Sequence, residues 1–438
     1  MGTYILGIDI GTTSICALAL EAGTGVVLAS QTVPNAAAIV SSQSFARMQD
    51  PQTILAAATN LRDGIIARFG LPAAVGVTGQ MHGILYLDGN GAPVSPLYTW
   101  QDLRAAEQTP AGETYLEQIN RVTGYSVSAG YGLATHVYNL QNGLVPASAA
   151  KLCTIHDCLA MKLAGLSAPV MHVSDAASLG LFDLANGRFD AEATRKLGID
   201  PSILPAVAAR TEPIGLFAGK VPVCPAIGDN QASFFGSVGM GEGKVLVNVG
   251  TGSQVSVIGS LGKTAAGIEC RPFLDGKFLL VGSSLCGGRA YAVLEKFFRE
   301  VANLCGADIR SAYPMMDALM ATYAGTAEPL SVSTLFDGTR ENPALRGRID
   351  GISVSNLTPA ALMEGFMRGI SEELCSLYRG MAPHLRETPE EMVGSGNGLR
   401  VNPVLCRMME ETFGLPLRLS ESREEAALGA AGYAARER

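Results

Sequence analysis

The chain has 438 residues, which is too long for one ordinary hydrophobic core and fits two domains. Hydrophobic residues make up 47% of the chain and charged residues 16%, so a large interior is readily buried and extended disorder is disfavoured. The net charge is −8 without any block of Lys or Arg, which argues against nucleic acid or an anionic membrane as the main partner. No apolar run reaches the about 18 residues that a membrane span needs, so we expect a cytoplasmic protein.

The first third of the chain opens with short β-rich runs. Residues 4–8 predict a strand that ends in Asp9-Ile-Gly11-Thr-Thr-Ser14, and residues 14–20 and 26–30 predict two more strands of a meander. Residues 52–69 have apolar side chains at helical spacing. Residues 74–78 then predict a buried strand of the same mixed sheet, which leads into Gly79-Gln-Met-His-Gly83.

The same opening recurs near the middle of the chain. An apolar run at residues 244–249 is followed by Gly250-Thr-Gly-Ser253, so the pairs that align are Asp9 with Asn248, Gly11 with Gly250, Thr12 with Thr251 and Ser14 with Ser253. The repeat indicates two similarly built domains that face each other across a cleft. We place their boundary in the glycine-rich segment 236–243, which gives domains 1–238 and 239–438.

The second half is richer in helical patterns. These cover residues 290–304, 360–381, 402–413 and 424–435, and a short strand at Met392-Val393 precedes Gly394-Ser-Gly-Asn-Gly398. The nine cysteines are scattered without a C-x-x-C pair, so we expect reduced, buried thiols rather than zinc ligands or disulfides.

The segment Asp9–Ser14 carries groups suited to phosphoryl transfer. A tight glycine hairpin after a strand presents consecutive amides and hydroxyls to phosphate oxygens, and Asp9 at the strand end can reach a metal ion. The alternative is an ordinary hairpin with a solvated Asp.

Three weaker glycine segments in the second half have related chemistry. Gly250-Thr251 forms a matching hairpin that suits the same phosphates, although a plain β-turn fits the letters too. Gly394-Ser-Gly396-Asn397, between a strand and a helix, could cradle an adenosine and its α-phosphate, and Gly287-Gly288 precedes another helix.

Asp229 lies directly after Gly228 at the end of an apolar run. A carboxylate on such a bent backbone could point into a cleft and act as a general base toward a hydroxyl. An equally supported alternative is that Asp229 caps a helix that begins near Gln231.

Two further loops combine polar groups that suit a ligand with many hydroxyls. They are Gly79–Gly83, with Gln80, Met81 and His82, and Trp100-Gln-Asp102-Leu-Arg104, which holds the one tryptophan of the chain. The alternatives are a core tryptophan and an Asp–Arg pair on the surface.

Taken in order, these motifs resemble the FGGY family of carbohydrate kinases, in the superfamily that also contains actin and Hsp70. The resemblance extends over nearly the whole chain, from Asp9–Ser14 to Ala427-Leu-Gly-Ala-Ala431. It implies an α/β fold of two RNase H-like domains, each a mixed sheet flanked by helices, with an interdomain cleft. It also implies transfer of a phosphoryl group from ATP, with Mg²⁺, to a sugar.

The resemblance also assigns roles, which we write as expectations. Asp229 matches the catalytic base and Asp9 the acid on the metal side. The positions that match sugar contacts are Gln80, Met81, His82, Trp100, Asp102 and Asn230. The positions expected on the nucleotide are Gly11, Thr12, Thr13, Ser14, Gly250, Thr251, Gly288, Gly394, Gly396 and Asn397.

Within the family, the segments 97–102, 228–233 and 271–273 look most like those of the kinases that act on sedoheptulose, whereas Gln80-Met-His-Gly83 also occurs in xylulose kinases. The other hypotheses are a sensor that binds sugar or nucleotide without catalysis, and an ATPase that acts on proteins. The presence of both Asp9 and Asp229 speaks against the first, and the sugar loops against the second. We expect a sugar and ATP as the partners, and leave a homodimer open.

Overall fold

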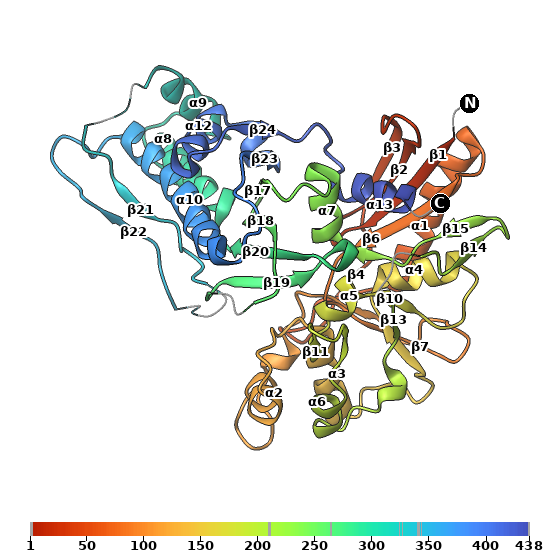
Figure 1. Cartoon of the computed structure of the whole chain (residues 1–438). Coiled ribbons are helices and arrows are strands. Elements are labelled where there is room, and N and C mark those ends of the chain that lie inside the picture. Colours follow the sequence, from red (N-terminus) through yellow and green to blue (C-terminus); the bar gives the residue numbers. More distant parts are fainter. Residues whose placement is uncertain are drawn as a thin grey trace. The chain divides into compact units, whose positions relative to one another are not determined.

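The computed structural model of the chain (Figure 1) describes residues 3–208, 212–262, 265–323, 325, 327–339, 342 and 344–436. The chain folds into two compact α/β units. The first consists of Met1–Gly239, Arg271–Gly276 and Glu424–Arg438, and the second of Met240–Cys270 and Lys277–Arg423. The expected α/β class with a mixed sheet in each half is confirmed, whereas the C-terminal segment, which we assigned to the second half, packs in the first unit.

The main sheet of the first unit has the order β14-β15-β6-β1-β2-β3, and β16 also pairs with β6. Strands β1, β2 and β3 form the expected antiparallel meander, whereas β6 runs parallel to β1, β15 and β16. The seven strands are β1 (Tyr4–Ile10), β2 (Ser14–Glu21), β3 (Val27–Pro34), β6 (Ala74–Gly79), β14 (Gly215–Phe217), β15 (Val221–Val223) and β16 (Ile227–Gly228).

Helices and short strands surround this sheet. The helices are α1 (Pro51–Phe69), α2 (Tyr115–Thr123), α3 (Gly132–Gln141), α4 (Ile155–Leu163), α5 (Val173–Ser178), α6 (Ala191–Lys196), α7 (Asp229–Val238) and α13 (Glu425–Arg436). The short strands are β4 (Ala38–Ile39), β5 (Met48–Gln49), β7 (Leu85–Leu87), β8 (Leu97–Tyr98), β9 (Lys151–Cys153), β10 (Val170–His172), β11 (Phe182–Asp183), β12 (Arg188–Phe189) and β13 (Ala206–Ala208).

The C-terminal helix α13 belongs to the first unit because its small residues fit against glycines in the sheet. Figure 1 shows α13 beside β1 and β6, at the opposite end of the colour scale. A Cβ atom added to Gly7 would lie 2.1 Å from the carbonyl oxygen of Ala427, and one added to Gly76 would lie 2.0 Å from that of Ala430. This close approach of helix and strands explains why the helix is rich in alanine.

The second unit is built around a sheet of order β19-β20-β18-β17-β23-β24. Its strands are β17 (Lys244–Val249), β18 (Ser253–Gly259), β19 (Ile268–Pro272), β20 (Phe278–Ser284), β23 (Glu391–Ser395) and β24 (Leu417–Leu419), and a separate pair is β21 (Ser331–Ser333) with β22 (Arg348–Asp350). Its helices are α8 (Gly287–Leu304), α9 (Tyr313–Thr322), α10 (Pro359–Met381), α11 (Asn397–Arg400) and α12 (Pro403–Phe413). Helix α10 packs against β18 and β20 and against α8, α9 and α12.

The predicted repeat is confirmed by the strand pairing. In the first unit β1 pairs antiparallel with β2 and parallel with β6, and in the second β17 pairs antiparallel with β18 and parallel with β23. The two antiparallel pairs are joined by Gly11–Thr13 and by Gly250–Gly252, which are loops of equal length. Each unit therefore presents one glycine hairpin next to the end of a parallel strand.

Two further expectations concern the whole chain. All nine cysteines lie in described segments and none of them is in a disulfide. Cys305 is exposed and Cys270 and Cys406 are half-buried, so the expectation of buried thiols is wrong at these three positions. Of the helices formed by the described residues, none has both the length and the apolar character that crossing a membrane requires.

Candidate active site

The ends of three parallel strands meet at one edge of the sheet in the first unit. Gly79 of β6 pairs in register with Ile10 of β1 and with Gly228 of β16. The amide of Gln80 donates to the carbonyl of Ile10 at 2.8 Å. The hairpin after β1, the loop after β6 and Asp229 after β16 therefore lie side by side, where open α/β sheets bind their ligands.

The hairpin Gly11–Thr13 is held from two directions. The amide of Gly11 donates to the carbonyl of Ser14 at 2.9 Å, which closes the turn. Asn35 holds the outer side, because its side-chain amide donates to the Gly11 carbonyl and its backbone amide to the Thr13 carbonyl, both at 2.9 Å. Thr13 is exposed at the tip. Asn35 was not predicted as a site residue. Its position directly after β3 is the one feature of the sequence that could have indicated it.

Asp9 stands at the end of β1 in an acidic and poorly solvated position. Its Oδ1 atom is buried and has no hydrogen-bond partner among the described residues. Burial, together with the nearby carboxylates of Asp229 and Glu424, raises the pKa of Asp9 to about 8. A carboxylate of this kind favours a cation beside it.

Asp229 is the first residue of α7, and the residue that caps this helix is Gly228. The alternative in which Asp229 itself caps a helix near Gln231 is therefore wrong, because the helix begins two residues earlier. Burial raises the pKa of Asp229, while His156 and Arg271 act in the opposite direction. The neighbouring Asn230 has a buried Oδ1 atom that no described residue pairs with.

The loop after β6 is tied to the hairpin through side chains. Thr12 accepts a hydrogen bond from the indole of Trp100 at 2.9 Å and donates to Oε1 of Gln80 at 3.3 Å. Gln80 in turn donates to Oε1 of Gln49 at 2.8 Å. Trp100 is 42% exposed, so the core tryptophan considered above is wrong and its ring remains available to a ligand. Gln49 was not foreseen.

Met81 and His82 complete the loop. Met81 is buried against Gly228, where an added Cβ would lie 2.6 Å from its sulfur. His82 has a φ of 71°, a conformation that only an over-determined loop maintains. Its Nδ1 lies 2.8 Å from the Ser178 carbonyl, and its ring stacks on Tyr131 at 4.6 Å between centroids. No motif in the sequence indicated Ser178 or Tyr131 as a partner of His82.

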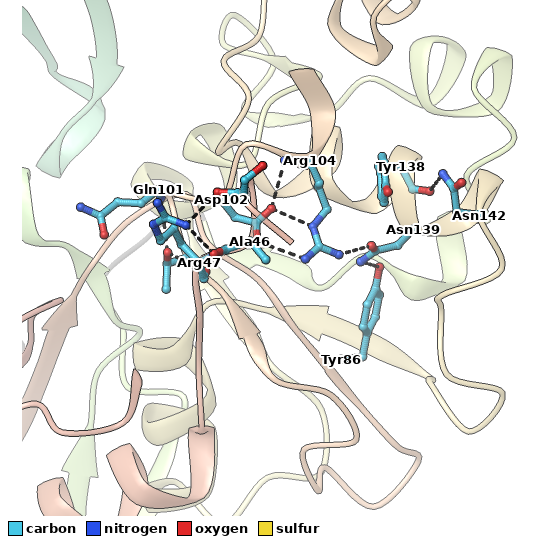
Figure 2. Close-up of polar contacts among 11 residues, drawn as sticks. Ala46, Arg47, Tyr86, Gln101, Asp102, Arg104, Tyr138, Asn139 and Asn142 are labelled. Carbon is cyan, nitrogen blue, oxygen red and sulfur yellow. Dashed lines mark hydrogen bonds and ion pairs between the residues drawn. The ribbon is translucent and has the colours of Figure 1, made fainter. Parts of the chain in front are cut away.

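Asp102 forms a buried ion pair with Arg104, so the alternative of a surface pair is wrong. The carboxylate accepts four hydrogen bonds, three from Arg104 and one from the amide of Arg47. Figure 2 shows the guanidinium of Arg104 between Asp102 and Asn139. Because a carboxylate has about four acceptor sites, this arrangement uses all of them inside the protein.

Arg104 is itself surrounded. It donates to Asn139 at 2.6 Å, Asn139 donates to the Tyr86 hydroxyl at 3.3 Å, and the guanidinium carbon lies 4.1 Å from the centre of the Tyr98 ring. The pair of Asp102 and Arg104 thus holds the loop that carries Trp100 in place.

In the second unit, four of the six residues predicted to contact the nucleotide line a pocket of about 700 Å³. Gly250, Thr251, Gly288 and Asn397 are among its walls, together with Tyr291, Tyr313, Asp317 and aliphatic side chains. The amide of Gly288 donates to the carbonyl of Gly250 at 2.9 Å, and that of Arg289 to Thr251 at 3.0 Å, so α8 starts against the hairpin. The start of α8 at Gly287 places the glycine pair inside its first turn.

The other two predicted glycines of the second unit lie at the end of β23. Gly394 is a strand residue, and Gly396, with a φ of 83°, makes the turn into α11. A Cβ on Gly396 would lie 2.6 Å from the carbonyl oxygen of Val249, so this turn packs tightly on the end of β17. Asn248, the counterpart of Asp9 in the repeat, donates to Oγ of Ser395 at 2.7 Å.

The chain matches two models of known families over almost its full length. Residues 4–236 match the N-terminal domain of the FGGY family of carbohydrate kinases, and residues 245–437 match the C-terminal domain of that family. The chain belongs to the FGGY family of carbohydrate kinases. It is accordingly a phosphotransferase with an alcohol group as acceptor, and ATP and a sugar are its small-molecule partners.

The chain is also similar to characterised members of the family. It is 29% identical to the sedoheptulokinase of Mus musculus, over 97% of this chain and 96% of that protein, and 28% identical to the sedoheptulokinase of Homo sapiens over the same shares. It is 24% identical to a xylulose kinase of Streptomyces coelicolor, over 99% of this chain and 88% of that protein.

Solved structures of the family have the same fold. The xylulose kinase of Rhodospirillum rubrum matches with a TM-score of 0.84 at 22% identity, over 99% of this chain and 89% of that one. The gluconate kinase of Lactobacillus acidophilus matches with a TM-score of 0.84 at 19% identity, over the same shares.

Proposed function

We propose that this kinase transfers the γ-phosphate of ATP to a primary hydroxyl of a ketose, and that it converts sedoheptulose to sedoheptulose 7-phosphate. The observation that carries the proposal is the meeting of Asp229 with the loop Gln80–His82 at one edge of the first sheet. In this assignment the first unit binds the sugar and supplies the base, and the second unit binds the nucleotide.

Asp229 is the proposed general base. Phosphoryl transfer to an alcohol needs a group that accepts the hydroxyl proton as the oxygen attacks. The burial that raises the pKa of Asp229 makes the carboxylate more basic than an exposed one, while His156 and Arg271 keep its ionised form accessible. The proton passes from the sugar hydroxyl to a carboxylate oxygen of Asp229 while the hydroxyl oxygen forms a bond to the γ-phosphorus of ATP. The bond from that phosphorus to the oxygen it shares with the β-phosphate breaks, and ADP leaves.

The sugar contacts that we propose come from Gln80, His82, Trp100 and Asn230. The buried Oδ1 of Asn230, with which no described residue pairs, is suited to accept a hydrogen bond from a sugar hydroxyl, and the exposed face of Trp100 can pack on C–H groups of the sugar. Asp102 was expected to touch the sugar too. Since its carboxylate already accepts four hydrogen bonds, we propose that it acts by holding the Trp100 loop in place.

The residues at the end of β1 fit a Mg²⁺ ion. The evidence for this fit is the environment of Asp9. Its Oδ1 is buried, lacks a described hydrogen-bond partner and lies near two further carboxylates, so a cation would relieve the repulsion among the three negative charges. Asp9 would hold the ion, directly or through water. Mg²⁺ bound to ATP neutralises charge on its phosphates.

The phosphates and the adenosine have separate proposed sites. The hairpin Gly11–Ser14 and the pocket hairpin Gly250–Thr251 offer backbone amides and hydroxyls to phosphate oxygens. The pocket of about 700 Å³ combines such polar groups with aliphatic walls and Tyr313, a mixture that suits a purine nucleoside. Its contacts with Asn397 and Gly398 support the expected role of the turn after β23.

Sedoheptulose is preferred over xylulose on two grounds. The two sedoheptulokinases are the more similar relatives, and they align over almost their entire length. The segments 97–102, 228–233 and 271–273 resemble the same kinases. Xylulose is the second candidate, because Gln80-Met-His-Gly83 is shared with xylulose kinases and a xylulose kinase aligns over 99% of the chain.

The experiment is a coupled assay of ADP release with a panel of ketoses, run with the wild type and with Asp229→Asn. We expect ATP-dependent turnover with sedoheptulose that the variant loses. A wild type that releases no ADP with any ketose, although the protein is folded, would reject the proposed function.

A further inference from the structure

A compact group of titratable side chains lies beneath the proposed site. His156 and Asp157 are in the first turn of α4, and Asp175 is in the first turn of α5. All three are at most 1% exposed, and one potential ligand atom from each lies within 4.8 Å of the other two. Nε2 of His156 lies 3.0 Å from Oδ2 of Asp175, although the two atoms do not meet the angles of a hydrogen bond.

Buried polar atoms are almost always paired, and most of those in this cluster are not. Among the described residues, neither ring nitrogen of His156 and neither oxygen of Asp175 makes an aligned hydrogen bond. Asp157 differs, because its Oδ2 accepts from the Thr154 hydroxyl at 2.6 Å. The cluster could not remain buried as separate charges, so its carboxylates must be neutralised by a proton, by the imidazole or by a bound cation.

The cluster contacts the backbone that carries Asp229. A Cβ placed on Gly79 would lie 3.1 Å from Cβ and Nδ1 of His156, and Gly79 is the register partner of Gly228. Ser174, which precedes Asp175, accepts a hydrogen bond from the amide of Gly228 at 3.5 Å. The starts of α4 and α5 thus approach the strand end just before Asp229 from two directions.

The charged groups that interact electrostatically with Asp229 come from four elements. They are Asp9 on β1, His156 on α4, Asp175 on α5 and Arg271 on β19. Asp9 is the residue proposed to hold Mg²⁺, and Arg271 lies on β19, which follows α7 in the chain. His156 and Asp175 are the two that are fully buried, and the mechanism above gives neither a task beyond the electrostatic effect of His156.

We propose that His156 and Asp175 share one proton as a buried pair, and that this pair positions the Asp229 carboxylate toward the sugar hydroxyl. Both are positioning residues. The shared proton stays within the pair, and Asp229 alone takes the proton of the hydroxyl. A pair that is neutral overall avoids the cost of burying two separate ions and still offers Asp229 a fixed dipole. The proposal rests on the assignment of Asp229 as the base.

The kinetic test uses His156→Gln and Asp175→Asn, which keep the shape of each side chain. We expect kcat to fall by about 10- to 100-fold, because a small displacement of the base is enough for such a loss, with KM for sugar and ATP nearly unchanged. His136→Gln is the matched control, since His136 is a buried imidazole of the same unit whose Nδ1 lies 2.8 Å from the Tyr86 hydroxyl. If kcat falls only in proportion to the loss of thermal stability, and by the same proportion in His136→Gln, the positioning role is rejected.

A second test does not depend on turnover. The chain has five histidines, so the imidazole ¹⁵N signals of His156 can be assigned by their absence in His156→Gln. Asp175→Asn and Asp229→Asn should both move these signals, and those of His136 should stay in place. If Asp229→Asn leaves the His156 signals unmoved, the coupling is rejected. If these signals move but the wild type phosphorylates no ketose, the proposal of the His156–Asp175 pair is supported and the proposed function is rejected.

The purified wild type also distinguishes a proton from a metal ion. Metal analysis after dialysis against a chelator should find no stoichiometric ion that depends on Asp175. One equivalent of a divalent cation that is lost in Asp175→Asn would overturn the shared proton and identify the cluster as a metal site.

Discussion

Gly79 and Gly228 are register partners in the parallel pair of β6 and β16, and neither position has room for a side chain. A Cβ on Gly79 would lie 2.8 Å from the carbonyl oxygen of Ile10, and one on Gly228 would lie 2.6 Å from the sulfur of Met81. These two glycines let β1, the loop after β6 and the start of α7 approach one another. The position of Asp229 relative to the proposed sugar loop depends on this close packing.

Replacement of Asp229 by Asn should lower kcat by about 10²- to 10⁴-fold and leave KM for the sugar nearly unchanged. The amide keeps the shape of the side chain and removes its ability to accept a proton in the transition state. Steady-state kinetics with saturating ATP measure both constants. Near-normal turnover in this variant would remove Asp229 as the base.

Asp9→Asn should make the metal-free protein more stable at high pH but not at low pH. Because folding raises the pKa of Asp9 from its ordinary value of 3.8 to about 8, the folded chain binds more protons than the unfolded chain between these values. Stability therefore falls as pH rises through this window. The neutral amide escapes this loss, so the Tm of the variant should exceed that of the wild type above about pH 8 and match it near pH 3.8.

Thermal unfolding in the presence of a chelator measures this difference, and Asp50→Asn is a suitable control because the pKa of Asp50 is lowered by its hydrogen bond to Thr53. The variant of Asp9 should also need more Mg²⁺ for half-maximal activity, with sugar binding intact. An unchanged Mg²⁺ titration would show that Asp9 is not on the metal side.

Arg104→Gln should lower the free energy of unfolding by about 3–5 kcal/mol, because it leaves the buried Asp102 without its cation. It should also lower kcat/KM for the sugar, since the loop that carries Trp100 loses its support. Urea unfolding followed by activity measurements tests both effects. The matched control is Arg121→Gln, where the same kind of pair with Glu113 is exposed and little change is expected. Equal effects of the two substitutions would contradict the supporting role of the buried pair.

Gly288→Ala should raise KM for ATP and leave KM for the sugar unchanged. The added Cβ would lie 2.4 Å from the carbonyl oxygen of Gly250, so the start of α8 or the hairpin must shift at the nucleotide pocket. Gly241→Ala in the same unit is the control, because its Cβ would make ordinary contacts with Lys244. A variant with unaltered ATP kinetics would argue against the hairpin Gly250–Thr251 as a phosphate site.

The sequence predicts most of the fold because its patterns are local. Strand β1, helix α1 and helix α10 follow from the spacing of apolar residues, and the structure places their ends within a residue or two of the prediction. The domain bounds 239–438 rest on position in the chain and agree with the family match over residues 245–437, but helix α13 packs in the first compact unit. Its packing on Gly7 and Gly76 is a contact between distant segments, which no local pattern records.

The same distinction holds for the candidate site. Motifs after strand ends indicated Asp9, Asp229 and the Gln80–His82 loop, because such ends gather functional groups in α/β folds. The partners that hold them, such as Gln49 and Asn35, are isolated polar residues whose neighbours are set by tertiary packing. Asp102 is the opposite case, a residue that a motif indicates but whose partners it does not. Its motif is evident in the sequence, whereas its four internal hydrogen bonds are visible in the structure alone.

The central claim is tested most directly by the ratio of kcat/KM for sedoheptulose to that for xylulose, measured with the same enzyme and saturating ATP. A site built to bind a hydroxyl penalises an analogue that lacks it by up to about 10⁴-fold, because buried donors are left unpaired. We therefore expect sedoheptulose to give the highest kcat/KM of the common ketoses, with phosphorus NMR locating the phosphate on C7 and xylulose as the nearest competitor. Equal or better efficiency with xylulose or ribulose would contradict the assignment to sedoheptulose.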